Sequence, residues 1–457
     1  MDREVSLTEM LEARETRVFR QQALTKRYAL PVISFSLNIA GPVKNGPVIR
    51  RTFREGLSRL SDALQAARVN VTHQEQVDQV TGCEAILVVQ SEAREIKRLC
   101  VGLEDEDGLG RLFDMDVLDS DGNKLDRESL GHPPRPCLVC GKAGKGCASR
   151  RLHTVEELQG TTRKIMGDFF AQKDGEVVAG QAVRALLYEV CTTPKPGLVD
   201  RSNSGSHQDM DVFTFVDSAA ALLPYFRKAV SIGQNTAGRP PGEAFFRLRR
   251  AGLEAERAMF AATGGINAHK GAIFSLGTVC ASAGRLWTPE VPWAPADRIL
   301  EECAAVSREA VEADFAALRT QTAQTRGQQF FLEYGLRGIR GELAGGLPAV
   351  RDVGLPALER ALEAGASLEE AGASALIRLI ADVADTNLIA RGGREGQKWA
   401  AETASQMNGT VLDRKSLETL DQEFIRRNLS PGGCADLLAI TYFLHFCQEA
   451  GQTRSLA

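Results

Sequence analysis

A change of pattern near residue 170 constrains the fold of this 457-residue chain more than any other feature. Before it, alternating apolar segments typical of strands are mixed with segments of helical periodicity. After about residue 175, strand patterns nearly vanish, and apolar residues recur at helical spacing between Gly and Pro breaks. The sequence therefore predicts two domains, residues 1–172 with an α/β or α+β fold and residues 173–457 with an all-α fold. The charged segment 172–176 is the expected boundary.

The periodicities also place individual elements. In the first domain, strands are expected over residues 30–39, 85–89 and 111–117, and helices over 52–68 and 154–170. In the second domain, helices are expected over residues 180–190, 212–229, 241–260, 271–286, 296–315, 355–364, 368–384 and 435–449. The polar segments between these elements are where sites are expected.

Net charge and cysteine usage indicate the compartment of the protein and the classes of partner that it binds. The formal net charge is -4, so the chain as a whole is not attracted to nucleic acid or to an anionic membrane. The N-terminus lacks an apolar signal segment, and no run of about 18 or more apolar residues is present to cross a bilayer. Most of the 10 cysteines are isolated, which is typical of reduced thiols. We therefore expect a cytoplasmic protein with no nucleic-acid or membrane partner.

Paired acidic residues in the first domain indicate phosphate chemistry. Asp114 and Asp116 are two apart in a strand-like run, so both side chains should face one side of a sheet. Two carboxylates so placed can bind Mg²⁺ beside a polyphosphate. Lys44, Arg50 and Arg51 precede or begin a helix and suit phosphate oxygens. Each feature alone is more often a solvated surface, but together they would serve nucleotidyl transfer with release of diphosphate.

Three motifs follow one another in this domain. They are Gly41-Pro42-Val43-Lys44 with Arg50-Arg51, then Gly110-Arg111-Leu112-Phe113-Asp114-Met115-Asp116-Val117, then Pro134-Arg135-Pro136-Cys137-Leu138-Val139-Cys140, after an arginine-rich start with Arg14, Arg17, Arg20 and Gln21. This order resembles the apo-citrate lyase phosphoribosyl-dephospho-CoA transferase family over about residues 10–160. The resemblance implies a nucleotidyltransferase-like domain that modifies a serine of the citrate lyase acyl carrier protein. It also implies Mg²⁺ at Asp114 and Asp116, with phosphate contacts from Arg111.

A group of cysteines stands apart from the isolated ones. Cys137, Cys140, Cys147 and His153 have the spacing C-x2-C-x6-C-x5-H, and four such ligands could close a tetrahedral structural zinc site. The alternative is three buried thiols and a packed imidazole. The spacing leaves both interpretations open.

A stiff, polar loop opens the second domain. Proline and glycine make the segment 189–210 irregular, and a loop of this kind held between helices is a candidate site. Its polar residues are Lys195, Asp200, Asn203, Ser204, Ser206, His207 and Asp209. The alternative is a connector in which Asp209 or Asp211 caps the next helix.

Three further segments have a similar character. Asn267, His269 and Lys270 lie in a glycine-flanked run that enters a helix, where backbone N–H groups can hold an anion. Asp382 and Asp385 are three apart and should share the face of a mostly buried helix, where carboxylates need partners or a metal. The remaining candidates are Asn387, Arg391, and the glycines Gly432 and Gly433 before the last helix.

The order of these segments carries a second resemblance. They read TPKPGLVD (193–200), GSHQDM (205–210), GINAHKG (265–271), DTN with RGG (385–387 and 391–393) and PGGCAD (431–436). This set resembles the triphosphoribosyl-dephospho-CoA synthase family over nearly all of residues 180–450. The resemblance implies an all-α fold that condenses ATP with 3′-dephospho-CoA and expels adenine.

That reaction sets demands on the candidates. A carboxylate should accept the proton of the attacking 2′-hydroxyl, and Asp200 or Asp209 is expected to do so. A donor near the purine is needed so that adenine leaves as a neutral base, and His207 or His269 could serve. The triphosphate should be held by Mg²⁺ on Asp382 and Asp385 and by the cations Lys195, Lys270 and Arg391. Further substrate contacts are expected from Asn203, Asn267, Asn387, Gly432 and Gly433.

The two resemblances concern consecutive reactions, because the product of the second domain is the substrate of the first. The sequence therefore predicts a bifunctional transferase of citrate lyase prosthetic-group synthesis, with the acyl carrier protein as partner and tethering as the reason for fusion. Two alternatives stay open. One is a helical hydrolase of ADP-ribose-type bonds fused to a nucleotidyltransferase, and the other is a non-catalytic scaffold that binds the carrier protein.

Overall fold

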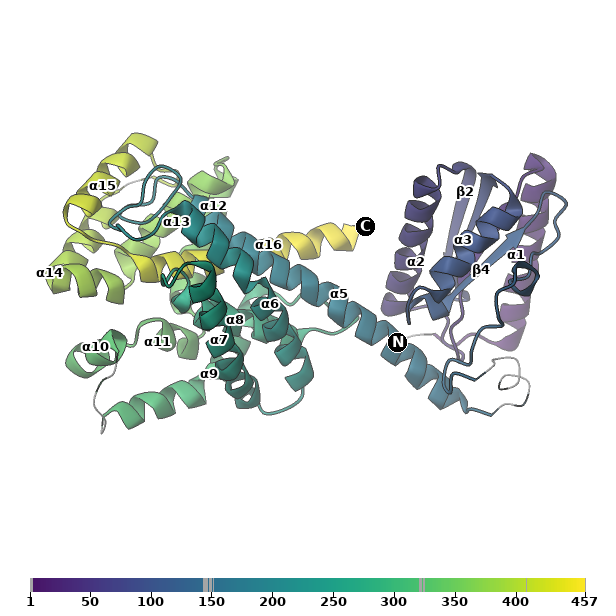
Figure 1. The fold of residues 1–457 in the computed structure, drawn as a ribbon, viewed down its shortest axis with the longest axis horizontal. Helices are drawn as coiled ribbons and strands as arrows, with labels where there is room; N and C mark the ends of the chain where they lie inside the picture. The colour runs from purple at the N-terminus through teal and green to yellow at the C-terminus, as the bar shows by residue number, and fades with distance from the viewer. Residues whose placement is uncertain are drawn as a thin grey trace. The chain divides into compact units, whose positions relative to one another are not determined.

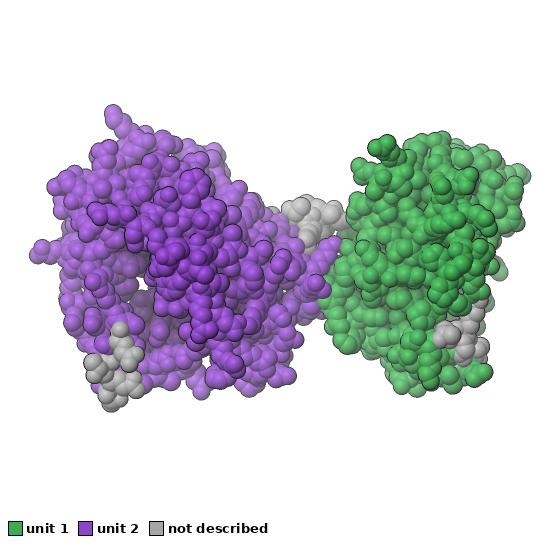
Figure 2. All heavy atoms as spheres, viewed as in Figure 1, with its two compact units in different colours: residues 1–170 green, residues 171–457 purple. Residues whose placement is uncertain are grey.

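The computed structural model describes residues 3–142, 147, 150, 152–319, 323, 325–407 and 409–456, with backbone alone for 452–456. The chain divides into two compact units, residues 1–170 (unit 1) and 171–457 (unit 2), shown in different colours in Figure 2. Helix α5 (Val155–Cys191) runs through this division, so the segment 172–176 is helical and does not form an irregular linker. The predicted helices at 154–170 and 180–190 are both parts of α5.

Unit 1 contains a four-stranded sheet with the order β2-β3-β1-β4 (Figure 1). The strands are β1 (Val32–Leu37), β2 (Asn70–Gln79), β3 (Gly82–Gln90) and β4 (Phe113–Leu118). Every pairing is antiparallel, so unit 1 is an α+β domain and not a parallel α/β domain. The three predicted strands are confirmed, whereas β2 escapes prediction because its side chains are polar and mostly exposed. The nucleotidyltransferase likeness stays a prediction.

Helices cover both faces of the sheet. Apolar side chains of α1 (Leu7–Tyr28) pack on one face, and those of α2 (Pro47–Ala66) and α3 (Ala93–Asp105) pack on the other. The predicted helix at 52–68 corresponds to α2. Two short 3₁₀ segments, Gly110–Leu112 and Glu128–Leu130, lie before and after β4 in the chain.

Alternation along the strands puts acidic side chains on the α1 face. Met115 and Val117 belong to the buried cluster under α2 and α3, so Asp114 and Asp116 point the other way. Glu84 of β3 lies between two residues of the same cluster and joins the aspartates on the α1 face. One strip of this face is therefore polar, while the rest of it is apolar and packs against α1.

Unit 2 is helical throughout its described residues, as predicted. Its elements after α5 are α6 (Val212–Thr236), α7 (Pro241–Ala262), α8 (Lys270–Leu286), α9 (Ala296–Leu318), α10 (Arg326–Tyr334), α11 (Gly338–Gly345), a π-helical turn (Val350–Gly354), α12 (Leu355–Glu363), α13 (Leu368–Asp382), α14 (Thr386–Ser405), α15 (Arg414–Arg426) and α16 (Gly432–Leu456). Helices α10, α11, α14 and α15 were not predicted. The predicted helix 368–384 ends at Asp382, where the chain becomes extended.

The last helix, α16, runs through the core of unit 2. Its middle carries Ile440, Tyr442, Phe443, Leu444 and Phe446, all of which are fully buried. It packs against α8, α13 and α14, so it has little polar surface of its own. None of the described helices combines the length and apolarity that a membrane span requires.

We predict that Phe35→Ala destabilises unit 1. The Phe35 ring is fully buried, stacks on Phe53 at 4.9 Å and meets Phe113 edge-on at 5.6 Å. Its removal should lower the free energy of unfolding of unit 1 by about 3–5 kcal/mol, because a cavity replaces the ring. Hydrogen exchange should speed up in β1 and β3 and stay unchanged in α8. The control Phe213→Ala removes an exposed ring of unit 2 and should leave β1 unaffected.

Candidate active sites

The acidic strip of unit 1 borders a cavity of about 500 Å³ beneath the first half of α1. Asp114 and Asp116 line it from β4, and Arg14 and Arg17 line it from α1, with Lys44 close by. The structure thus brings both predicted carboxylates to one cavity with the predicted Lys44. The arginine-rich start of the chain also contributes directly.

Charges in this cavity are crowded and partly desolvated. Burial raises the pKa of Asp114, and the neighbouring charge of Asp116 raises it further. The Lys124 ammonium lies 2.6 Å from an Asp116 oxygen. Burial lowers the pKa of Lys44, with a smaller effect from Arg14, and its ammonium donates to the Ile39 carbonyl at 2.5 Å. A cavity with both signs of charge can hold a cation and a polyphosphate together.

Three predicted arginines lie elsewhere. Arg50 donates to the Asn45 side chain at 3.1 Å, and Arg51 packs over the Phe170 ring at 4.1 Å. Arg111 lines a second cavity of unit 1, of about 850 Å³, and donates to the Pro136 carbonyl. None of the three lines the cavity of the paired aspartates, and their contact with phosphate stays a prediction. Arg50 and Arg51 are used locally at the start of α2, as basic residues on helix faces usually are.

Cys137, Cys140, Cys147 and His153 also come together in unit 1. Their ligand atoms all lie within 4.8 Å of one another. Three of the four, Cys137, Cys147 and His153, line the second cavity.

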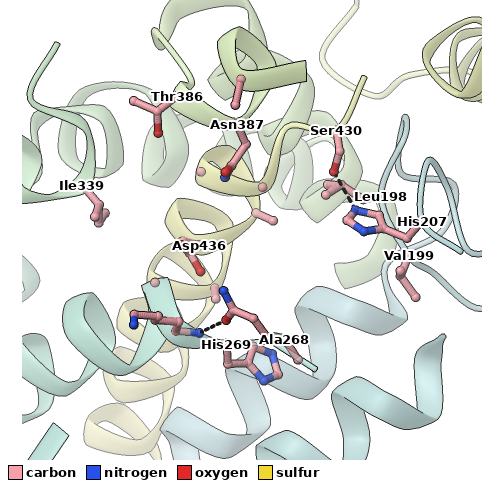
Figure 3. Close-up of a pocket in the computed structure, with 18 of the residues that line it drawn as sticks. Leu198, Val199, His207, Ala268, His269, Ile339, Thr386, Asn387, Ser430 and Asp436 are labelled. Atoms are coloured by element: carbon pink, nitrogen blue, oxygen red, sulfur yellow. Dashed lines mark hydrogen bonds between the residues drawn. The ribbon is translucent and has the colours of Figure 1, made fainter. Parts of the chain in front are cut away.

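The four polar segments predicted in unit 2 converge on one cavity of about 450 Å³ (Figure 3). The loop after α5 supplies Lys195 and His207, and the other walls come from the first residues of α8, α14 and α16. The predicted residues that line it are Lys195, His207, Asn267, His269, Lys270, Asn387, Arg391, Gly432 and Gly433. Segments more than 200 positions apart in the sequence are thus brought to one site.

Three helices begin at this cavity. Lys270 opens α8, Thr386 opens α14 and Gly432 opens α16, and all three residues line the wall. Some of the N–H groups at these helix starts are already bonded, to Asp385 in α14 and α16 and to Asn267 in α8. Each helix N-terminus carries partial positive charge from the helix dipole. Together with the guanidinium of Arg391, this makes the cavity suited to a polyanion.

The predicted bases of the loop do not reach the cavity. The carboxylate of Asp200 is buried and accepts hydrogen bonds from the backbone N–H groups of Lys195 (3.0 Å), Ser202 (2.6 Å) and Asn203 (3.1 Å). Asp209 is largely exposed, 4.0 Å from the His207 ring. The expectation that either residue acts as the base is not supported, because Asp200 shapes the loop and Asp209 faces solvent.

Asn203 also belongs to the loop scaffold. Its amide donates to Asp421 at 2.8 Å, and the other Asp421 oxygen accepts the Gly197 N–H at 2.9 Å. Asp211 caps α6 by accepting the Thr214 N–H at 3.0 Å, which confirms one of the two caps weighed from the sequence. Three acidic side chains, Asp200, Asp211 and Asp421, therefore fix the loop by accepting hydrogen bonds from backbone N–H groups.

A cluster of charge lies at the closed end of the cavity. Lys195, which is 1% exposed, forms an ion pair with Glu189 of α5, and both residues line the cavity. Asp436 of α16 faces the same space, and Figure 3 shows it near the segment that carries His269. Burial raises the pKa of Asp436 to about 8, with contributions from Glu189 and Asp385. Asp436 is consequently mostly protonated at neutral pH.

Gly271 makes room for this carboxyl group. A Cβ atom at position 271 would lie 1.9 Å from an Asp436 oxygen. A side chain at this second residue of α8 would therefore displace the Asp436 carboxyl group. This contact gives a packing reason for Gly271, the second glycine of the GINAHKG segment.

Both histidines are neutral at physiological pH. Burial lowers the pKa of His269 to about 3, and its Nδ1 shares a hydrogen bond with Ser218 at 2.7 Å. Burial and the charge of Arg391 lower the pKa of His207, whose Nε2 lies 3.0 Å from the Ser430 hydroxyl. Neither residue carries an added proton at this pH, and the prediction that His207 or His269 donates a proton to adenine is untested.

The predicted magnesium pair of unit 2 does not share a helix face, although Asp382 and Asp385 both line a further cavity of about 470 Å³. Helix α13 ends at Asp382, which is exposed, and Asp385 caps the next helix, α14. Asp385 is buried and accepts N–H groups from Asn387 (2.7 Å), Leu388 (3.3 Å) and Cys434 (2.8 Å). The two residues therefore share no helix face, and Asp385 uses its oxygens to join the starts of α14 and α16.

Sequence reasoning missed Glu189 and Asp436 as site residues. Each is a single carboxylate in an otherwise apolar stretch of helix, ALLYEVC in α5 and CADLLAI in α16. A buried carboxylate is costly unless it has a partner, so its isolation in an apolar run was the available signal.

Comparison with known proteins matches both units. A family model described as ATP:dephospho-CoA triphosphoribosyl transferase (CitG) matches residues 176–455. A second, described as apo-citrate lyase phosphoribosyl-dephospho-CoA transferase (CitX), matches residues 5–169.

Full-length relatives join the same two parts. The chain is 35% identical to Protein CitXG of Leuconostoc mesenteroides subsp. cremoris, over 96% of this chain and 97% of the relative. It is also 35% identical to Protein CitXG of Haemophilus influenzae, over 97% and 96%. A 2-(5''-triphosphoribosyl)-3'-dephosphocoenzyme-A synthase of Pectobacterium atrosepticum is 40% identical over 58% of this chain and 87% of the relative.

We expect Asp436 to make unit 2 less stable as the pH rises. In the unfolded chain its carboxyl group would lose its proton near pH 4 (about 3.9), whereas in the fold it keeps the proton to about pH 8. The folded state thus binds more protons, so stability should fall by up to about 1.4 kcal/mol per pH unit between these values. Asp436→Asn should remove this slope. Chemical denaturation from about pH 5 to about pH 8 tests it, and equal slopes in both proteins would contradict the assignment.

Proposed function

We propose a function from the premise that the chain belongs to the CitXG family of fused citrate lyase maturation proteins and is a transferase. Unit 2, within residues 173–457, condenses ATP with 3′-dephospho-CoA to 2′-(5″-triphosphoribosyl)-3′-dephospho-CoA and releases adenine. Unit 1, within residues 1–172, transfers the phosphoribosyl-dephospho-CoA group to a serine of the citrate lyase acyl carrier protein and releases diphosphate.

The arrangement of unit 2 around three helix N-termini carries the first half of this proposal. The reaction leaves the ATP triphosphate intact, so the protein must hold that polyanion while the bond between ribose and adenine breaks. The starts of α8, α14 and α16, with Arg391 and Lys270, offer N–H groups and positive charge on one wall. The protonated Asp436 and the neutral His269 lie on the same cavity.

Proton transfer in unit 2 follows from these protonation states. The 2′-hydroxyl of dephospho-CoA attacks C1 of the ATP ribose through an oxocarbenium-like transition state, as in glycoside chemistry. Asp436, protonated near neutral pH, gives its proton to the departing adenine. The hydroxyl proton passes to the Asp436 carboxylate as adenine leaves, which restores the protonated form of Asp436. The buried Lys195–Glu189 pair adds a fixed dipole to the wall of the same cavity.

The carboxylates of unit 1 fit a magnesium ion. Asp114 and Asp116 share one face of β4, and the mutual repulsion that raises the pKa of Asp114 would be relieved by a cation. When bound, Mg²⁺ would neutralise charge on the departing diphosphate. Arg14 and Lys44 are placed to hold phosphate oxygens in the same cavity. In unit 2 the residues predicted to hold Mg²⁺ do not fit, because Asp385 is occupied by three N–H donors.

Fusion of the units keeps the intermediate near its next enzyme. The product of unit 2 is the substrate of unit 1, and a tether raises the effective concentration at the second site. The scaffold alternative conflicts with cavities whose charged walls are assembled from distant segments.

We predict that variants of the two units block different steps. The full chain would be incubated with ATP, Mg²⁺, dephospho-CoA and apo acyl carrier protein, and both adenine and the carrier mass would be measured. Asp436→Asn should reduce adenine release by about 100-fold or more, because the proton donor is lost. Asp114→Asn should leave adenine release intact and abolish carrier modification. Asp382→Asn, which alters an exposed carboxylate, should retain both activities.

The outcomes also separate the alternatives. Adenine released from ATP without dephospho-CoA would show a hydrolase. A carrier protein that is bound but never gains mass, with no adenine formed, would show a scaffold.

The pH dependence of adenine release should report Asp436. The rate at saturating substrates should fall as the pH rises above about 8, since the carboxyl group then loses the proton that it donates. Asp436→Glu should retain activity with a shifted descending limb. A wild-type rate that increases steadily through this range would indicate that Asp436 acts as a base or not at all.

A further inference from the structure

The geometry of unit 1 points to a feature that neither proposed reaction requires. We propose that Cys137, Cys140, Cys147 and His153 bind one structural zinc ion. Their ligand atoms all lie within 4.8 Å of one another, and the sulfurs of Cys140 and Cys147 are 3.5 Å apart. A tetrahedral zinc ion, with bonds of about 2.3 Å to sulfur and about 2.0 Å to nitrogen, needs ligand atoms about 3.3–3.8 Å apart.

The first two ligands sit on a turn that aims both sulfurs the same way. The Cys137 N–H donates to the Lys142 carbonyl at 2.6 Å, and the Gly141 N–H donates to the Cys137 carbonyl at 2.9 Å. Gly141 has a φ of 69°, a left-handed conformation that favours glycine. The Lys142 N–H is directed at the Cys140 sulfur. Backbone N–H groups aimed at sulfur stabilise a thiolate ligand, so the turn supports metal binding.

His153 is oriented as a metal-bound histidine is. Its Nδ1 lies 3.7 Å from a Glu157 oxygen, and its Nε2 is buried with no hydrogen-bond partner among the described residues. Glu157 is itself fixed at the start of α5, where it accepts the Thr154 N–H at 2.8 Å and donates its own N–H to the Thr154 hydroxyl at 3.1 Å. At 3.7 Å the carboxylate is near Nδ1 without accepting a hydrogen bond from it, and the buried Nε2 is the nitrogen left for a metal.

A disulfide explains less of this geometry. A bond between Cys140 and Cys147 would need the sulfurs about 2.05 Å apart, and it would leave Cys137 and the unpaired His153 nitrogen without a role. Three thiols and an imidazole converging on one point satisfy a zinc ion completely and leave no open position for catalysis. The site is therefore structural.

The ion would hold the wall of the second cavity. Cys137, Cys147 and His153 line this space together with Arg111 and Arg135. The turn at 137–142 and the start of α5 are separate segments of the chain. A zinc ion bound by residues of both would link them. Loss of zinc should therefore disturb unit 1 and leave the core of unit 2 unchanged.

Metal content tests the proposal independently of either reaction. The full chain, purified under reducing conditions without chelator, should contain about one zinc ion per molecule by mass spectrometry of the metal. Cys140→Ser and His153→Ala should lose most of it. His153→Cys should retain it, because four thiolates also bind zinc. Cys191→Ser alters a cysteine outside the cluster and serves as the matched control.

Cobalt gives a second readout, which covers variants that fold poorly. Apo protein refilled with Co²⁺ should show the intense visible absorption of a tetrahedral thiolate site, and His153→Cys should shift that spectrum. Wild-type protein that is folded and reduced yet takes up neither metal would overturn the proposal. So would zinc content that is equal in all variants, or a Cys140–Cys147 disulfide found by peptide mapping of protein isolated without reductant.

Discussion

The buried ion pair between Lys195 and Glu189 is the interaction that joins the loop of the unit 2 cavity to α5. Taking two charges out of water costs several kcal/mol per ion, and this cost is offset only when the pair is close and the surrounding groups are satisfied. The pair fixes the loop after α5 against that helix, and Asp200 then holds the loop by accepting three backbone N–H groups. His207 is placed at the cavity only because the loop has this shape.

Both units use one physical strategy. Each has an apolar framework in which a few carboxylates are exposed on one side only, so that their charges interact strongly with one another and with nearby cations. In unit 1 the two-residue repeat of β4 separates Met115, in the core, from Asp114 and Asp116, in the cavity. In unit 2 a single carboxylate, Asp436, emerges from the apolar helix α16 where α8 has a glycine. The apolar core of each unit thus fixes the positions of these carboxylates.

The sequence allowed the regular parts to be predicted, because periodicity reflects burial directly. The helical unit 2, the strands β1, β3 and β4, and the shared face of Asp114 and Asp116 follow from that reasoning. The grouping of the four polar segments of unit 2 was expected from the family resemblance and not from periodicity. No local pattern shows whether a carboxylate faces a ligand or its own backbone, and for this reason Asp200 was misjudged.

Asp382 and Asp385 were misplaced for a related reason. Their spacing fits a helix, but Asp385 gains more by capping α14 and joining α16 than by continuing α13. The site depends on such contacts between distant segments. A structure of the full chain with bound ATP and no dephospho-CoA tests the account most directly. The triphosphate should lie at the starts of α8, α14 and α16, with adenine near Asp436. ATP bound elsewhere, or with its adenine far from Asp436, would contradict it.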